Sequence, residues 1–151
     1  MDTNDAIREV IALIQPEVRK NEVKLRIDLD PALPPVQGNR VLLQQVLLNL
    51  LINAIEAMAA IDRVDRNLQI ISRRLEPSMV LVAVRDSGPG LGKHSFEDIS
   101  EAFFTTKPNG MGMGLSISRS IVENHGGRLW AEPNSDRGAT FQFTLPLNDE
   151  A

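Results

Sequence analysis

The chain contains no cysteine, and among its 151 residues it has only two histidines, His94 and His125. The lack of cysteine excludes disulfides, thiolate metal sites and cysteine nucleophiles, and two histidines this far apart argue against a histidine-rich zinc site. Lys and Arg number 16 against 20 Asp and Glu, for a net charge of −4, so nucleic acid is not an expected partner. No apolar run approaches the ~18 residues that cross a bilayer, and no signal-peptide pattern begins the chain. We therefore expect no membrane contact by this domain and a cytoplasmic location.

What the chain does contain is an ordinary globular composition, with 42% hydrophobic and 24% charged residues. Its length fits one domain with a real apolar core. Because neither an internal repeat nor a linker divides the sequence, we expect residues 1–151 to form a single domain.

Hydrophobic periodicity predicts helices and strands along most of the chain. Helices are expected at residues 4–19, about 39–60 and 115–124, and Pro16 is expected to kink or end the first of them. Strands are expected at residues 23–29, 68–75, 79–86, 128–131 and 139–147, with a hairpin at 76–78. This pattern predicts an α+β fold with helices packed on a largely antiparallel sheet. Residues 87–114 hold six of the ten glycines, and a loop of that length in a compact domain is usually functional.

The second predicted helix is apolar almost all round except for one polar arc. At ~100° per residue, the polar side chains of this arc fall within about 80° of one another. They are Gln45, Asn49, Asn53 and Glu56. Buried polar groups without partners cost roughly 1–3 kcal/mol each, so the arc bonds neighbouring backbone, faces solvent or lines a cleft. In a cleft, amide oxygens at i and i+4 could coordinate a hard cation such as Mg²⁺. The arc alone does not decide between these interpretations.

The strand that ends at Asp86 runs directly into the glycine-rich sequence Ser87-Gly-Pro-Gly-Leu-Gly92. A carboxylate at a strand end beside glycines can be aimed at a ligand that approaches the backbone closely. Since an ionised Asp only accepts hydrogen bonds, Asp86 would select a donor such as the adenine amine and disfavour the guanine carbonyl. The alternative is a turn in which Asp86 makes an Asx hydrogen bond. The glycine spacing matches neither the phosphate loop nor the dinucleotide-binding fingerprint.

A second glycine cluster, Gly110-Met-Gly-Met-Gly114, opens directly into the third predicted helix. Free N–H groups at a helix start, with no side chains in the way, suit a polyphosphate. The alternative is a flexible turn. Upstream, the sequence Phe103-Phe104-Thr-Thr-Lys107 places two aromatic side chains and a cation on the same loop. Lys107 is either a solvated surface residue or a point charge within reach of a terminal phosphate.

Taken together and in this order, four segments resemble the N, G1, F and G2 boxes of sensor histidine kinases. They are Asn49-Leu-Leu-Ile-Asn53-Ala, Asp86-Ser-Gly88-Pro-Gly90, Phe103-Phe104-Thr-Thr-Lys107 and Gly110-x-Gly112-x-Gly114-Leu. Over essentially its whole length the chain is similar to the ATP-binding catalytic domain of the GHKL superfamily. The amino-acid sequence of its motifs resembles that of the oxygen-sensing and nitrogen- or dicarboxylate-regulating branch. The resemblance implies a Bergerat-type fold, which is a two-layer α/β sandwich. It also implies a leading helix at residues 1–20 and a long ATP lid at residues 91–113.

By this resemblance the domain binds ATP and Mg²⁺ and transfers the γ-phosphate to a histidine on a separate dimerisation domain. Asn53 would ligate Mg²⁺ with help from Asn49, and Asp86 would bind the adenine amine. The other implied nucleotide contacts are Gly88, Gly90, Phe104, Lys107, Gly110, Gly112, Gly114 and Leu115. Asn49 and Lys107, the latter on the lid, are the implied catalytic residues.

Three positions refine what the resemblance implies. Glu56 stands where many relatives carry a phosphate-facing Lys, so that contact is expected to be absent and Lys107 to carry more of the charge. Asn39 stands where Asp is common before the long helix, with little expected effect beyond a weaker helix-start hydrogen bond. ATP-hydrolysing relatives carry a water-activating Glu at the position of Asn49, and an amide cannot act as a base. The sequence therefore favours a kinase over a hydrolase.

The sequence shows no histidine phosphoacceptor motif on an amphipathic dimerisation helix. We therefore expect an excised catalytic domain that binds ATP without phosphorylating itself, with a histidine-bearing domain and a response regulator as partners. His125 ends a helix where a cation suits the helix dipole, and a structural role is expected for it; His94 is expected in solvent. Two alternatives stay open: a stand-alone GHKL serine kinase of the anti-sigma type, and a non-catalytic nucleotide-binding module.

Overall fold

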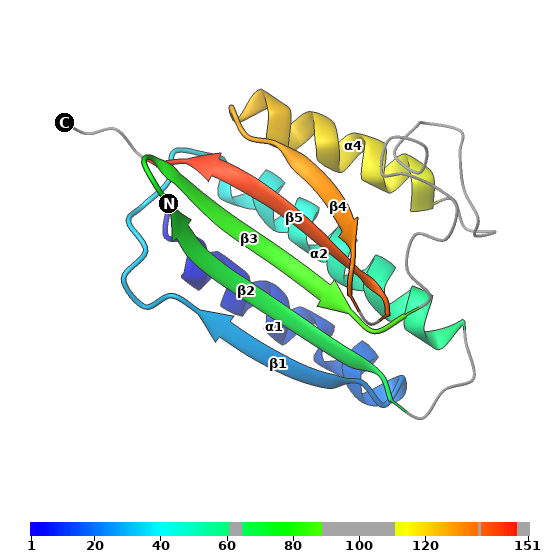
Figure 1. Ribbon diagram of the computed structural model, residues 1–151. Helices are drawn as coiled ribbons and strands as arrows, with labels where there is room; N and C mark the ends of the chain where they lie inside the picture. Colours follow the sequence, from blue (N-terminus) through cyan, green and yellow to red (C-terminus); the bar gives the residue numbers. More distant parts are fainter. Residues whose placement is uncertain (61–64, 89–110, 136, 148–151) are drawn as a thin grey trace.

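The computed structural model describes residues 1–60, 65–88, 111–135 and 137–147, and these residues form two layers (Figure 1). One layer is a β-sheet, and the other consists of helices that cover one of its faces. The elements in chain order are α1 (Thr3–Lys20), β1 (Lys24–Leu29), α2 (Arg40–Ala59), β2 (Asn67–Leu75), β3 (Met79–Asp86), α4 (Met111–Asn124), β4 (Leu129–Pro133) and β5 (Ala139–Pro146). The predicted α+β architecture is confirmed.

The sheet of the described residues has the strand order β1-β2-β3-β5-β4. β1 pairs in parallel with β2, whereas the other pairs are antiparallel. A parallel pair needs a crossover connection, and α2 lies in the connection between these two strands. Along β3 the side chains alternate between the faces: Val82 and Val84 are 0% exposed and belong to the core beneath the helices. Asp86, two residues after Val84, therefore projects to the helix side of the sheet.

Helix α2 lies at the centre of the helical layer and is buried over much of its surface. Its buried residues are Leu43, Val46, Leu47, Leu50, Leu51, Asn53, Ala54, Ile55 and Met58. The helix begins where the sequence predicts, because Asn39 Oδ1 accepts the Leu42 N–H at 3.0 Å. Asn39 thus caps the helix in place of the Asp that is common there.

The same helix corrects the expectation that no segment is long and apolar enough to cross a bilayer. The helix is 20 residues long, and an 18-residue window within it has a mean hydropathy of 1.6, which meets that requirement by length and composition. The polar side chains of the arc interrupt the apolar residues of this helix, so its high mean hydropathy does not show as one long apolar run in the sequence. In the fold, α2 packs against α1, α4 and β3, and this position in the core accounts for its apolar composition.

The first helix continues through Pro16 to Lys20, so of the two expected effects of Pro16, a kink or an end, the end does not occur. Proline cannot donate a hydrogen bond to the carbonyl of Ala12, but both residues are exposed, and water can hydrate that carbonyl. Val18 is 7% exposed and belongs to the core. Its carbonyl accepts the Val23 N–H at 2.9 Å. Burial of Val18 therefore holds the last turn in helical form.

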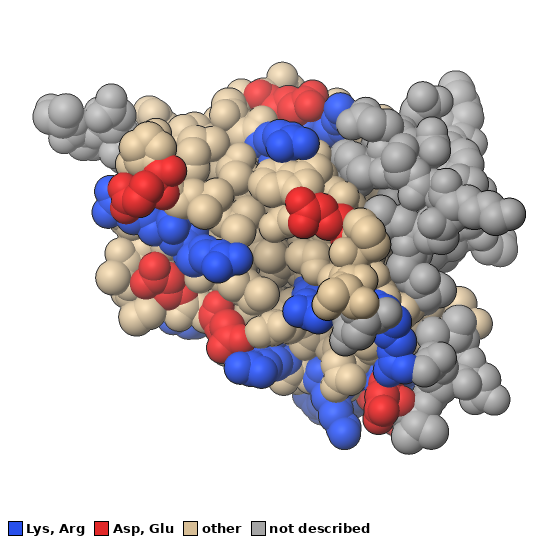
Figure 2. All heavy atoms as spheres, in the orientation of Figure 1, with Lys and Arg blue, Asp and Glu red and all other residues tan. Residues whose placement is uncertain are grey.

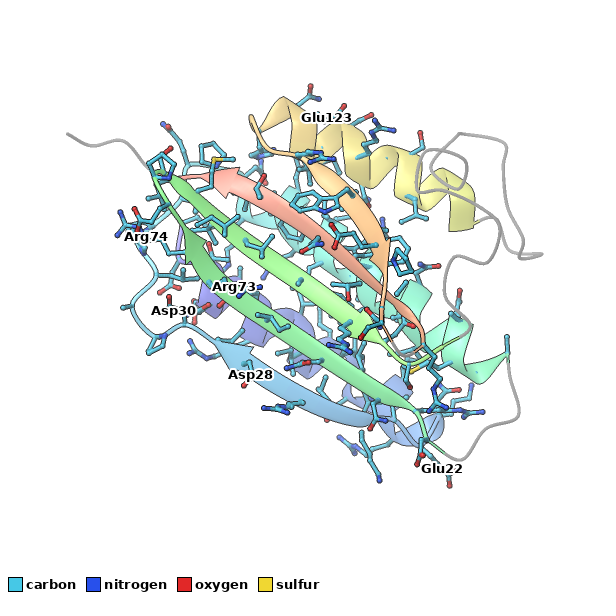
Figure 3. All side chains as sticks on the ribbon, in the orientation of Figure 1. Glu22, Asp28, Asp30, Arg73, Arg74 and Glu123 are labelled. Atoms are coloured by element: carbon cyan, nitrogen blue, oxygen red, sulfur yellow. The ribbon has the colours of Figure 1, made fainter. Side chains whose placement is uncertain are left out.

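A buried hydrogen-bond network fastens α1 to the sheet. The Asn4 side chain donates to the Asp30 carbonyl at 2.6 Å and accepts the Ser72 hydroxyl at 2.7 Å. The Ser72 Oγ in turn accepts the Asp30 N–H at 3.1 Å. Asp30, labelled in Figure 3, follows β1 and lies beside β2. One polar side chain of the helix is thereby bonded to β2 and to the residue that follows β1.

An exposed ion pair joins the outer side of α1 to the start of α2. The Arg40 guanidinium lies 2.9 Å from the Glu9 carboxylate and 3.1 Å from that of Asp5. Hydrogen bonds from the Gln44 amide and from Arg40 lower the pKa of the Glu9 carboxyl below its ordinary value. Because solvent screens exposed pairs, this contact adds little to stability, and α1 depends mainly on its buried face.

His125 connects the end of α4 to the start of α2. Its Nε2 accepts the Asn39 N–H at 3.0 Å, and its Nδ1 lies 2.8 Å from the Ile121 carbonyl oxygen. In this geometry Nε2 serves as the acceptor for the Asn39 N–H, and Nδ1 is placed to bond the Ile121 carbonyl. The expected structural role is therefore present, because the imidazole joins the two helices.

Replacing His125 with Ala removes the acceptor for the Asn39 N–H, and we expect a loss of about 1 kcal/mol in the free energy of unfolding. Urea denaturation of the variant and of the unmodified chain measures this change in the free energy of unfolding. Asn124→Ala, at the neighbouring exposed position on α4, serves as the control and should change stability little. Equal stability of His125→Ala and the unmodified chain would show that this hydrogen bond does not fasten the two helices.

Candidate functional site

Three segments that lie far apart in the sequence meet at one end of the molecule. Figure 1 shows the last turns of α2, the end of β3 and the first turn of α4 at this end. Glu123, labelled in Figure 3, marks the opposite end of α4. In the sequence, the polar arc lies on α2, and the two glycine clusters follow β3 and lead into α4. The contacts among these three segments therefore show whether the structure brings the predicted site residues together.

Asn49 joins α2 to the start of α4. Its Nδ2 donates to the Ser118 hydroxyl at 3.1 Å, and the Ser118 side chain is completely buried. A β-carbon placed on Gly114, one turn before Ser118, would lie 3.9 Å from the same Nδ2. The second glycine cluster therefore approaches the polar arc from the α4 side.

Asp86 and Gly88 join the end of β3 to the last turns of α2. Asp86 is 5% exposed, and its Oδ1 accepts the Gly88 N–H at 2.8 Å and the Ala139 N–H at 3.4 Å. The Asx hydrogen bond considered as an alternative is thus present. A β-carbon on Gly88 would lie 3.5 Å from the Ala57 β-carbon, so the first glycine cluster packs directly on α2.

Asn53 lies between these two contacts. It follows Asn49 by one helical turn and precedes Ala57 by another, and four residues advance a helix by about 6 Å. Its side chain is 8% exposed. Asn49, Asn53, Asp86, Gly88 and Gly114 therefore make up one candidate site, which is called the α2 site.

The donor chemistry of the α2 site fits a hard cation that keeps other ligands. Within the described residues, no group of three or more His, Cys, Asp or Glu could hold a metal ion. Two residues of the polar arc at this part of α2, Asn49 and Asn53, are carboxamides, whose oxygens suit Mg²⁺. Mg²⁺ usually takes few protein ligands and shares the substrate phosphates, so Asn49 and Asn53 are the described residues that could hold it together with a phosphate chain.

The other predicted site residues differ in what the structure says of them. Gly90, Phe104, Lys107 and Gly110 lie outside the described residues. Gly112 lies in the first turn of α4. Leu115 is 3% exposed and belongs to the hydrophobic core, so its side chain secures α4 against the sheet layer. Of the remaining polar arc, Gln45 is exposed and Glu56 is half-buried.

Sequence reasoning missed Ser118 and the Ala139 N–H, which bond Asn49 and Asp86. Ser118 follows Gly114 by one turn, but only the packing of α4 on α2 brings its hydroxyl to Asn49. The Ala139 N–H reaches Asp86 because β5 pairs with β3. Both partners come from tertiary packing, and no local sequence signal indicates them.

A separate hollow of about 560 Å³ lies over the open face of the sheet. Four cations border it, namely Lys24, Arg26, Arg85 and Arg137, and Figure 2 shows Lys and Arg side chains gathered over this end of the sheet. Asp86 is also among the residues that border this hollow, while its Oδ1 bonds the Gly88 and Ala139 N–H groups. The hollow and the α2 site therefore meet at the end of β3.

Comparison with known proteins identifies the family. Residues 38–149 match the family described as histidine kinase-, DNA gyrase B-, and HSP90-like ATPase. The sensor protein FixL of Bradyrhizobium diazoefficiens is 49% identical over 144 residues, which cover 95% of this chain and 28% of that protein. The C4-dicarboxylate transport sensor protein DctS of Rhodobacter capsulatus is 37% identical over 150 residues, which cover 99% of this chain and 23% of that protein. The chain thus spans about a quarter of the length of these relatives.

Solved structures agree with the sequence comparisons. The catalytic domain of histidine kinase ThkA superposes with a TM-score of 0.85 at 37% identity, covering 97% of this chain and 93% of that one. ThkA in complex with the response regulator protein TrrA gives a TM-score of 0.82 at 35% identity, covering 98% of this chain and 41% of that one. The chain belongs to the histidine kinase-, DNA gyrase B- and HSP90-like (GHKL) ATPase family, and within it to the ATP-binding catalytic domains of sensor histidine kinases.

Proposed function

We propose that this domain binds ATP together with Mg²⁺ at the α2 site and presents the γ-phosphate to a histidine on a separate dimerisation domain. One observation carries the proposal, namely that the N-box, G1 and G2 segments meet around the last turns of α2. Membership of the ATPase family supports the nucleotide as ligand. The donor chemistry of Asn49 and Asn53 supports Mg²⁺.

Asn53 and Asn49 would supply the protein ligands of Mg²⁺. The Asn49 Nδ2 faces Ser118, and this bond turns its Oδ1 away from Ser118. Asn53 lies one turn further along the same face of the helix, so the two carboxamides follow each other along one line. The cation, when bound, would neutralise charge on the phosphates that it shares with these residues.

Asp86 would recognise the base of the nucleotide. Its carboxylate is buried and held by the Gly88 and Ala139 N–H groups. A carboxylate accepts hydrogen bonds only, so it pairs with the amine of adenine and repels the carbonyl oxygen of guanine. Gly88, without a side chain, lets the base lie against this segment.

The start of α4 would receive the phosphates. The first N–H groups of a helix have no partner within the helix and carry partial positive charge. α4 begins at Met111, within the second glycine cluster. By the resemblance, Gly110, Gly112 and Gly114 line the phosphates and Lys107 contributes a cation from the lid.

The proposed reaction is phosphoryl transfer to histidine, in which this domain positions ATP and neutralises charge. An attacking neutral imidazole brings its own lone pair and needs little help from a base. Asn49 cannot activate water, which disfavours hydrolysis.

We further propose that residues 1–151 form one cytoplasmic domain without membrane or nucleic-acid contacts, and that a response regulator receives the phosphoryl group. The solved complex of ThkA with TrrA supports such a partner.

Transfer is tested by incubating the domain with radiolabelled ATP and the histidine-bearing domain of its parent protein. Label on the histidine of that added domain is the expected result. Label on serine of a candidate regulator would identify the anti-sigma type of kinase instead. ATP binding with persistent failure to label the histidine domain would identify a nucleotide-binding module.

Replacing Asn53 with Ala should abolish the tightening of ATP binding by Mg²⁺, because the cation loses a carboxamide ligand. Calorimetry with and without Mg²⁺ measures this effect. Gln45→Ala is the matched control, since Gln45 belongs to the same polar arc two turns earlier and is exposed; it should leave the Mg²⁺ effect intact. An unchanged Mg²⁺ dependence in Asn53→Ala would contradict the assignment.

Replacing Asp86 with Asn should narrow the preference for ATP over GTP by about tenfold, because the new amide can donate to the guanine carbonyl. The amide oxygen can still accept the Gly88 N–H, so the fold should persist. Competition binding with the two nucleotides provides the measurement. If the preference stays as in the unmodified chain, Asp86 does not read the base.

A further inference from the structure

The turn that joins β4 to β5 is hydrogen-bonded to the backbone of Asp86. Asn134 Nδ2 donates to the Asp86 carbonyl at 2.9 Å and to the Arg137 carbonyl at 3.0 Å. Asn134 Oδ1 accepts the Thr140 hydroxyl, and the Asn134 N–H donates to the Gly138 carbonyl at 3.0 Å. The one side chain thus fixes the shape of its own turn and bonds that turn to the end of β3, 48 residues earlier.

Gly138 in the same turn touches Asp86 directly. Its φ is +87°, and a β-carbon at this position would lie 2.0 Å from the Asp86 carbonyl oxygen. Any side chain would therefore push the turn away from β3. The next residue, Ala139, donates its N–H to Asp86 Oδ1 at 3.4 Å. The turn consequently contacts Asp86 at its carbonyl and at its carboxylate.

We propose that Asn134 is a positioning residue that sets the base selectivity of the site by holding Asp86 in place. This inference rests on the proposed function, in which the Asp86 carboxylate reads the adenine amine. Asp86 is the last residue of β3, beyond the pairs that β3 forms with β5. The Asn134 amide takes the place of the next sheet partner there. A displacement of tenths of an ångström at such a carboxylate weakens a hydrogen bond to the base.

The position of Asn134 separates base recognition from phosphate binding. Its bonds reach Asp86, Arg137 and Thr140, whereas the proposed phosphate and Mg²⁺ groups belong to α2 and α4. Loss of the Asn134 amide should therefore change the discrimination between bases and leave binding of the phosphate chain unchanged. A residue that merely stabilises the fold would weaken both together.

The test compares variants of the whole chain. Asn134→Ala removes the amide, and Asn134→Asp keeps its shape and the acceptor for Thr140 but removes both donated hydrogen bonds. Ser135→Ala changes an exposed neighbour in the same turn and is the matched control. Dissociation constants are measured for ATP, GTP and inorganic tripolyphosphate, each with Mg²⁺, together with the melting temperature.

We expect both Asn134 variants to lower the preference for ATP over GTP by about five- to tenfold, which corresponds to one or two ordinary hydrogen bonds. Tripolyphosphate binding should stay within about twofold of the unmodified chain, and Ser135→Ala should behave like that chain. If Asn134→Ala does not fold, Thr140→Val carries the test, because it removes only the hydroxyl that orients the Asn134 amide. That variant should lower the preference in the same direction by a smaller factor.

Equal losses for ATP, GTP and tripolyphosphate would overturn the inference, because they would assign Asn134 to fold stability alone. An unchanged ratio of ATP to GTP in the variants, with Asp86→Asn still lowering it, would also overturn it while the proposed function stands. If the unmodified chain itself fails to prefer ATP over GTP, the proposed function fails and this inference with it.

Discussion

The placement of polar side chains on a buried helix is the constraint on which the rest of the site depends. Helix α2 packs against α1, α4 and β3, so carboxamides on its surface must meet a hydrogen-bond partner or a ligand. Asn49 meets Ser118 of α4, and Asn53 follows it one turn later, at 8% exposure. Because β3 ends and α4 begins at this part of α2, the polar arc, the buried Asp86 and a helix start share one location.

Close packing also gives a structural role to two glycines of the sequence motifs, Gly88 and Gly114, and to Gly138 in the β4–β5 turn. Gly88 lies against Ala57, Gly114 lies near Asn49, and Gly138 approaches the Asp86 carbonyl so closely that no side chain fits. Gly114 and Gly138 bring backbone up to residues of the proposed ATP site, and Gly88, itself in that site, packs on α2. The motif residues therefore shape the site through packing within the protein, in addition to the contacts proposed with the nucleotide.

The sequence predicted local features well and long-range partners poorly. Periodicity located α2 and β3 within a residue of their observed ends, because burial on one face or all faces leaves a pattern in the chain. The helix does not end at Pro16, because burial of Val18 and hydration of an exposed carbonyl outweigh a local breaker. Ser118 and Asn134 were missed because their partners depend on how α4 and the β4–β5 turn pack, which no local pattern records. The family resemblance of the motifs assigned Asn53 and Asp86 to the same predicted ATP site. Their roles, as Mg²⁺ ligand and as the group that recognises adenine, stay predictions.

Amide chemical shifts of the isotope-labelled chain, recorded during titration with Mg²⁺-ATP and with adenosine, test the α2 site most directly. The account predicts that Mg²⁺-ATP shifts the amides of Asn49, Asn53, Gly88 and Gly114, whereas adenosine shifts Gly88 and leaves Asn49 and Gly114 unmoved. Shifts confined to the open face of the sheet, at Lys24, Arg26 and Gln69, would contradict it.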